Sequence, residues 1–318
     1  MTESLQLSGA IPANIMPFRA DYSIDEGEYR RHLDWLASVP GVGGITCNGH
    51  AAEVSVLTRK ERQWAAAVAV ATVNHRVPVV AGIYAESYRQ AIDLALDVKA
   101  EGVDALLIFP LNALLLGGDH EMVYRHYAEI ASAVGLPMVL FMYPAWTRMQ
   151  YGEELLQRLL TDIPLIVAVK EWSLDIGVYE RNLRVLRSLD RHVAMLTSHS
   201  TNLLPSLALG ADGILSGHGS VICDLQAQLL RAAGSGRREE AAVLYDRIQG
   251  LTRVVYRDPL GDMYTRMKEQ LVMLGRLREA VSRPPLLPIS DVERGELRDA
   301  LRKAGLLAAD AAGVGSKR

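Results

Sequence analysis

The chain has 318 residues, of which 49% are hydrophobic and 22% charged, and its net charge is −3. This is an ordinary globular composition, and the slightly acidic balance gives no basis for binding nucleic acid or an anionic membrane. Two cysteines, Cys47 and Cys223, are too few for a disulfide framework, and no run of 18 apolar residues predicts a membrane span. The N-terminus has no basic stretch followed by an apolar core, so we expect no signal peptide and a cytoplasmic location.

Eight short apolar runs alternate with longer segments of helical period. The runs cover 9–16, 41–48, 77–83, 102–109, 136–143, 163–170, 192–198 and 211–217. They are continuously apolar rather than alternating, which is typical of parallel strands buried on both faces. Eight such β-then-α units predict an α/β fold of the (β/α)8 TIM barrel type. A doubly wound sheet is the alternative, but no glycine-rich phosphate fingerprint follows the first run.

The boundaries of the expected elements carry their own signals. Three capping boxes predict helix starts, at Ser23-x-x-Glu26, Thr58-x-x-Glu61 and Ser87-x-x-Gln90. A glycine precedes three of the strands, at Gly41, Gly102 and Gly210. Glycine there can adopt the left-handed conformation that ends a helix and returns the chain to the sheet.

About 100 residues follow the eighth expected strand and have mostly helical character. We expect residues 1–222 to hold the barrel strands and most helices, and residues 223–306 to hold the last barrel helix and additional C-terminal helices. Residues 307–318 are expected to be a frayed tail.

Lys170 is a candidate catalytic residue, because it directly follows the apolar run Leu165–Val169. The question is whether its side chain is solvated or buried. The strand could simply end there with the ammonium in water, since lysine is rarely buried without a partner. Alternatively, a desolvated lysine has a lowered pKa and attacks carbonyls to form a Schiff base. The barrel favours the second interpretation, because chemistry in this fold lies at the C-terminal ends of the strands.

Other strand ends should then contribute partners. The second strand ends in Asn48, Gly49, His50 and Ala51, a loop whose backbone N–H groups can point at a substrate carboxylate. The fifth ends at Tyr143, which could instead be a packed aromatic with its hydroxyl in water.

The last two strands also end in polar residues. The seventh ends at His199, and the eighth ends in Ser216, Gly217 and His218. A lone histidine in a loop is more often a solvated surface residue, and a single G-x-G is weak evidence for a phosphate site. Residues 119–126 contain two histidines six apart rather than four, so we expect an ordinary helix with a Glu121–Arg125 pair and no metal site.

Together these motifs resemble the dihydrodipicolinate synthase / N-acetylneuraminate lyase family of Schiff-base aldolases over nearly the whole chain. The resemblance rests on residues 15–18, 48–62, 167–175 and 207–216, in matching order and spacing. It implies a barrel that is commonly a homotetramer, an imine between Lys170 and a 2-oxo acid such as pyruvate, and a carboxylate held by Gly49 to Ala51. Leu271, Val272 and Leu274 in the C-terminal part offer an apolar face for self-association.

The chain also departs from the family pattern. Alignment on Pro144 places Phe141 where the family has its catalytic tyrosine, and His50 and Ala51 replace two threonines. The tyrosine that many members lend across a subunit interface falls at Asn112, and an arginine of the synthases becomes Trp146. The familiar hydroxyl relay is therefore absent, and synthase activity is not expected.

Two residues could replace the lost proton carrier. His50 has an unperturbed pKa near 6.5, suited to proton transfer near neutrality, and Tyr143 lies two residues beyond Phe141 on the same strand face. We predict a class I lyase with Lys170, His50 and Tyr143 as catalytic residues, and Asn48, Gly49, Ala51, Phe141, Ser216 and Gly217 as substrate-binding residues. No metal or organic cofactor is required, because the protonated imine is the electron sink.

Two questions about the reaction stay open at this point. Aldol cleavage or condensation is favoured, and hydration or dehydration is the close alternative. A non-catalytic protein that binds an oxo acid on the same fold is the rival class. A purely structural role would not explain the lysine at the end of that strand.

Overall fold

The structure is a computed structural model that describes residues 5–308. Eight parallel strands form one sheet in the order β1-β8-β7-β6-β5-β4-β3-β2. Isolated parallel bridges join Ala10 to Val42 and Ala13 to Thr46, and so bring the two ends of the sheet together as a barrel. The strands are β1 (Gly9–Pro12), β2 (Ile45–Cys47), β3 (Val79–Ile83), β4 (Ala105–Ile108), β5 (Met138–Met142), β6 (Ile166–Glu171), β7 (Ala194–Thr197) and β8 (Gly213–Ser216). The predicted (β/α)8 barrel is confirmed, although each strand is shorter than the apolar run that predicted it.

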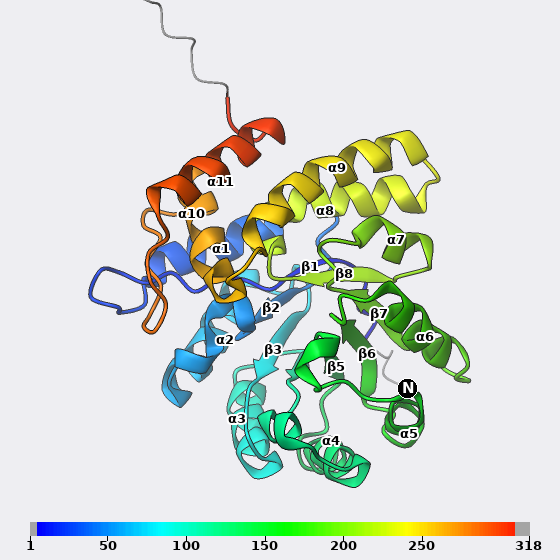
Figure 1. Cartoon of the computed structure of the whole chain (residues 1–318). Helices are drawn as coiled ribbons and strands as arrows, with labels where there is room; N and C mark the ends of the chain where they lie inside the picture. The colour runs from blue at the N-terminus through cyan, green and yellow to red at the C-terminus, as the bar shows by residue number, and fades with distance from the viewer. Residues whose placement is uncertain (1–4, 309–318) are drawn as a thin grey trace, which may run out of the picture.

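Helices surround the barrel, and further helices lie beyond the eighth unit (Figure 1). The surrounding helices are α1 (Glu26–Ser38), α2 (Arg59–Val73), α3 (Tyr88–Ala100), α4 (His120–Val134), α5 (Glu153–Asp162), α6 (Ile176–Arg187), α7 (Leu203–Ala208) and α8 (Gly219–Gly234). The additional C-terminal helices are α9 (Arg238–Val255), α10 (Met263–Met273) and α11 (Asp291–Lys303). α9 packs along α8, and α11 packs against α9 and α10. The predicted C-terminal helices are therefore present.

The expected division at residue 222 falls inside α8, which has a kink with non-helical backbone at Ile222. The division into residues 1–222 and 223–306 stays a prediction. Most of the expected tail, residues 309–318, lies outside the described residues.

Two of the three predicted helix starts are confirmed and one is wrong. Thr58 forms a complete capping box at α2, and Ser87 accepts the Gln90 N–H at α3. Asp25, not Ser23, caps α1, because the Ser23 hydroxyl and N–H are both bonded to the Asp21 carboxylate in the preceding turn.

The three glycines that precede strands all have the expected left-handed backbone. Their φ angles are 96° at Gly41, 87° at Gly102 and 105° at Gly210. An L side chain is strained in this region, so glycine at these positions has a physical reason.

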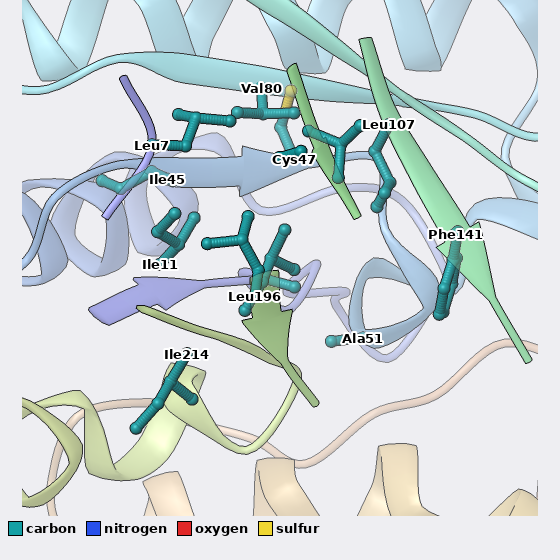
Figure 2. Packing of buried hydrophobic residues seen from close by; sticks show 14 of the residues in the cluster. Leu7, Ile11, Ile45, Cys47, Ala51, Val80, Leu107, Phe141, Leu196 and Ile214 are labelled. Carbon is teal, nitrogen blue, oxygen red and sulfur yellow. The ribbon is translucent and has the colours of Figure 1, made fainter. Parts of the chain in front are cut away.

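Buried apolar side chains of the strands pack inside the barrel and in the layer between the strands and the surrounding helices. Figure 2 shows Ile11, Ile45, Leu107, Leu196 and Ile214 among them, and all five are fully buried. Phe141 and Ala51 belong to the same cluster. The space for a substrate is therefore confined to the mouth, above this packed core.

Candidate active site

Lys170 lies near the C-terminal end of β6 and is only 4% exposed. Its Nζ is 3.8 Å from the centroid of the Phe141 ring. Phe141 on β5 is the direct strand partner of Lys170 on β6. Within the described part of the chain no carboxylate forms an ion pair with Lys170, and burial lowers its pKa to about 7. The Lys170 side chain is therefore not solvated at the end of the strand, and a large fraction of its amine is neutral near pH 7.

A narrow cavity surrounds Lys170 at the barrel mouth. Four other residues expected from the sequence line it: His50, Ala51, Phe141 and Gly217. Six more lining residues were not expected: Ala13, Trp172, Ser198, Tyr256, Met263 and Met267.

His50 and Tyr143 are joined directly, with 2.5 Å between His50 Nε2 and the Tyr143 hydroxyl. Burial, assisted by the charge of Lys170, lowers the pKa of His50 to about 3. The premise of an unperturbed histidine pKa is therefore wrong, and His50 is neutral at physiological pH. Burial also raises the pKa of Tyr143, so its proton stays on the phenol. The Tyr143 hydroxyl is hydrogen-bonded to His50, so the alternative of a packed tyrosine with its hydroxyl in water is wrong.

Aromatic rings enclose this pair. The ring of His50 is 4.9 Å from Phe109 and 6.2 Å from Trp172, while Phe141 is 4.7 Å from Tyr143, measured between ring centroids. The rings exclude water from the space between Lys170 and the pair, which explains why desolvation dominates the pKa of both groups.

Three of the expected substrate-binding residues lie beside the cavity rather than in its lining. Asn48 has a left-handed backbone with φ of 52°, and its side chain donates to the Arg62 carbonyl. Gly49 is the N-cap of the short helix η1 (His50–Ala52), and Ser216 is buried at the end of β8. The side chains of Asn48 and Ser216 therefore have no support from the geometry as substrate contacts, and Gly49 has only its backbone to offer.

The histidines after β7 and β8 are fully buried, so the solvated interpretation is wrong for both. His199 Nε2 is 2.5 Å from the Glu171 carboxylate and 3.0 Å from the Ser173 hydroxyl. These contacts fix the turn that follows β6. His218 Nε2 is 3.0 Å from the amide oxygen of Gln270 and so joins β8 to α10. Both histidines contact protein groups rather than the cavity.

A second buried lysine anchors α10 to the loop that carries His50. Lys268 Nζ lies 2.5 Å from Glu53 Oε1 and donates to the Val281 carbonyl at 2.6 Å. Glu53 also accepts the backbone N–H of Arg283 at 2.9 Å. Because Met267 precedes Lys268 and Glu53 follows η1 directly, this pair holds two walls of the cavity together.

The cavity residues that sequence reasoning missed come from two sources. Ala13, Trp172 and Ser198 directly follow β1, β6 and β7, and a place at a barrel strand end was a usable signal. Tyr256, Met263 and Met267 come from the end of α9 and from α10, outside the β/α repeat. Helical segments beyond the eighth unit give no local sign that they fold over the mouth.

No helix within residues 5–308 is long and apolar enough to cross a membrane. The same residues contain no group of three or more His, Cys, Asp or Glu side chains placed to hold a metal ion. Glu121 pairs with Arg158 rather than with Arg125, so the expected pair within α4 is wrong.

Comparison with known proteins identifies the family. The model of the Dihydrodipicolinate synthetase family matches residues 6–304. The 4-hydroxy-tetrahydrodipicolinate synthase of Nitratidesulfovibrio vulgaris strain DP4 is 30% identical over 304 residues, which cover 95% of this chain and 100% of that protein. The corresponding synthase of Bartonella bacilliformis is 30% identical and covers 95% and 99%.

Solved structures share the fold. YagE, a prophage protein of Escherichia coli K12 solved in complex with pyruvate, has a TM-score of 0.87 at 24% identity and covers 94% of this chain and 99% of its own. A dihydrodipicolinate synthase of Bacillus anthracis has a TM-score of 0.85 at 25% identity, with 94% and 99% covered. The chain belongs to the Dihydrodipicolinate synthetase family and is a class I lyase of the Schiff-base type that acts on a small 2-oxo acid.

Proposed function

We propose that Lys170 is the residue that forms the imine, with pyruvate or a similar 2-oxo acid. The observation that carries this proposal is a lysine that is buried in a cavity, has no carboxylate partner within residues 5–308, and has its pKa lowered to about 7. A neutral amine at this position attacks the ketone carbon, and loss of water gives the imine.

The carboxylate of the oxo acid fits the start of η1. The first N–H groups of a helix have no partner within the helix. In η1 the N–H groups of Ala52 and Glu53 bond to the carbonyls of Gly49 and His50, which leaves those of His50 and Ala51 to a ligand. Ala51 lines the cavity, so a carboxylate there stays within reach of Lys170.

His50 and Tyr143 replace the proton carrier that Phe141 lacks. His50 lines the cavity and its Nε2 is held by the Tyr143 hydroxyl. A proton removed from the carbon next to the imine can pass to His50, while the hydrogen bond to Tyr143 fixes the ring and supplies a second proton site. The protonated imine takes up the electron pair of that C–H bond, and an enamine results.

The enamine is the common intermediate of both candidate reactions. Attack on an aldehyde gives aldol condensation, and the reverse reaction gives cleavage. Loss or addition of water next to the enamine gives dehydration or hydration. We favour the aldol reaction, because the family that the sequence resembles consists of Schiff-base aldolases.

Incubation with pyruvate followed by borohydride tests the proposal. We expect an adduct on Lys170 by peptide mass mapping, together with exchange of the pyruvate methyl protons with deuterated solvent. An adduct on another lysine, or none across several 2-oxo acids, would contradict the Schiff base at Lys170. An adduct at Lys170 without proton exchange would support the rival, a protein that binds an oxo acid without turnover.

We further propose that the protein is a cytoplasmic homotetramer. The expected apolar face of α10 does not support this, because Leu271 is fully buried and Val272 and Leu274 pack against the core of the same chain. Support comes instead from the loop after β4, where Leu115 and Leu116 are 49% and 94% exposed. Light scattering at micromolar concentration should give a mass four times that of the chain, and a monomer mass would refute it.

A further inference from the structure

The lining of the cavity combines the reactive lysine with large side chains, most of them apolar. Trp172, Tyr256, Met263 and Met267 contribute to this lining, and we call these four residues the outer wall. We propose that the outer wall binds the carbonyl partner of the aldol reaction, and that this partner is an uncharged aldehyde with an apolar or aromatic substituent. The inference rests on the proposed function, because the aldehyde must react with the enamine on Lys170.

Charge is the first argument. Among the described residues that line the cavity, Lys170 is the single lysine or arginine, and it is consumed by the imine. His50 is neutral, since its pKa is lowered to about 3. Lys268 follows a lining residue but is committed to Glu53 at 2.5 Å. An aldehyde with its own carboxylate would therefore be desolvated without a cation to receive it.

The shape and polarity of the walls are the second argument. Met263 and Met267 are 7% and 1% exposed, so their flexible apolar side chains form a dry wall that adapts to a substituent. Trp172 adds an aromatic side chain to the same lining. Each methylene that such a wall buries strengthens binding roughly fourfold.

Room for the substituent comes from Gly217. A Cβ at this position would lie 3.4 Å from Ala51 Cβ, 3.6 Å from the Tyr256 hydroxyl and 3.9 Å from Met267 Cε. All three neighbours line the cavity, so a side chain at residue 217 would project among them. Glycine at this position leaves that space open.

Tyr256 supplies a polar group in the outer wall. Its hydroxyl oxygen accepts the backbone N–H of His218 at 3.1 Å and is also hydrogen-bonded to the Ser200 side chain. Burial raises the pKa of this phenol, so it stays neutral. The step balances without another reactant. The enamine carbon bonds to the aldehyde carbon, the C=O electron pair moves to oxygen, and that oxygen takes up the proton that His50 removed from the pyruvate methyl group. Water then hydrolyses the imine and restores Lys170.

The test compares two aldehydes of similar size, benzaldehyde and succinic semialdehyde, with the full-length protein and pyruvate. We expect kcat/KM for benzaldehyde to exceed that for the anionic aldehyde by about 100-fold or more, measured from the products by mass spectrometry. Equal rates, or a preference for succinic semialdehyde, would overturn the inference. Exchange of the pyruvate protons without condensation with either aldehyde would also overturn it, while leaving the proposed function intact.

Met263→Lys adds a cation to the outer wall. It should shift the ratio of the two kcat/KM values toward succinic semialdehyde by more than about tenfold. Met273→Lys, the same change at the other end of α10 and outside the cavity lining, is the matched control and should leave the ratio unchanged. An unchanged ratio in Met263→Lys, with the pyruvate adduct still formed, would place the aldehyde elsewhere.

Discussion

Two lysines are buried almost equally in this barrel, but their surroundings give them opposite roles. Lys170 is 4% exposed and meets an aromatic ring, while Lys268 is fully buried and meets the Glu53 carboxylate and a carbonyl oxygen. Burial lowers the pKa of both, but at Lys268 the carboxylate acts in the opposite direction. Desolvation alone therefore does not determine reactivity. The absence of a counter-charge within the described residues around Lys170 is what leaves its amine available as a nucleophile.

The largest effect should come from removing the reactive amine. Lys170→Met should abolish the borohydride adduct and lower turnover by more than about 10³-fold, because no other group can form the imine. Circular dichroism should show a native fold, since methionine fills a site that holds an unpaired amine. Turnover at the wild-type rate in this variant would mean that the two lysines have been assigned the wrong roles.

Lys268→Met tests the structural side of the comparison. It leaves Glu53 as an unpaired buried charge, which should cost about 3–5 kcal/mol in the free energy of unfolding measured with urea. Adding Glu53→Gln removes that charge, so the double variant should recover much of the loss. If the single variant were as stable as the wild type, the pair would not be what holds α10 to the loop after η1.

The sequence predicted the role of one of these lysines but not of the other. Lys170 could be predicted because a continuous apolar run ends in it and barrel chemistry lies at strand ends. Lys268 lies in an ordinary amphipathic helix, and its partner is distant in the chain, so its burial follows from tertiary packing alone. The expectation of an unperturbed pKa for His50 was wrong for the same reason, because the rings that desolvate it come from different strands.

The fold was more predictable than the site. The same pattern of an apolar run followed by a helical segment occurs eight times, and a glycine precedes three of the runs. Each unit therefore supported the interpretation of the next. The residues that close the cavity from α9 and α10 belong to no repeat. Ser23 shows the limit of local signals. Its hydroxyl donates a hydrogen bond to the Asp21 carboxylate, so it does not cap the helix.

Removing the proton carrier should separate binding at Lys170 from turnover. His50→Ala should slow exchange of the pyruvate methyl protons by about 10² to 10⁴-fold while leaving the adduct at Lys170. Tyr143→Phe, which keeps the ring and removes the hydroxyl, is the matched variant and should show the smaller loss, because His50 lines the cavity. If both variants exchanged protons at the wild-type rate, the carrier would lie elsewhere.

The pH dependence of imine formation should report the state of Lys170. Its pKa is lowered from 10.5 to about 7, so the neutral fraction grows as the pH rises toward 7. The rate of adduct formation should increase about tenfold per pH unit below about 6 and level off above about 7. Between about 7 and 10.5 the unfolded chain binds this proton and the folded chain does not, so this group's contribution to stability rises with pH. A rate that keeps rising to pH 10 would show an ordinary, solvated lysine.

The smallest effect should come from the ring that faces Lys170 in place of a carboxylate. Phe141 stabilises the ammonium form, because its face lies 3.8 Å from Nζ, and such contacts contribute about 0.5–2 kcal/mol. Phe141→Leu removes the ring but keeps an apolar wall, so the pKa of Lys170 should fall further. The pH profile of adduct formation should move to lower pH by about 0.5 to 1 unit. Phe109→Leu is the matched control, because Phe109 contacts Phe141 at 5.4 Å and has no contact with the Lys170 ammonium. A shift to higher pH in Phe141→Leu would mean that the ring acts on Lys170 mainly by excluding water. In that case the contrast between the two lysines would depend on hydration rather than on the partner that each one faces.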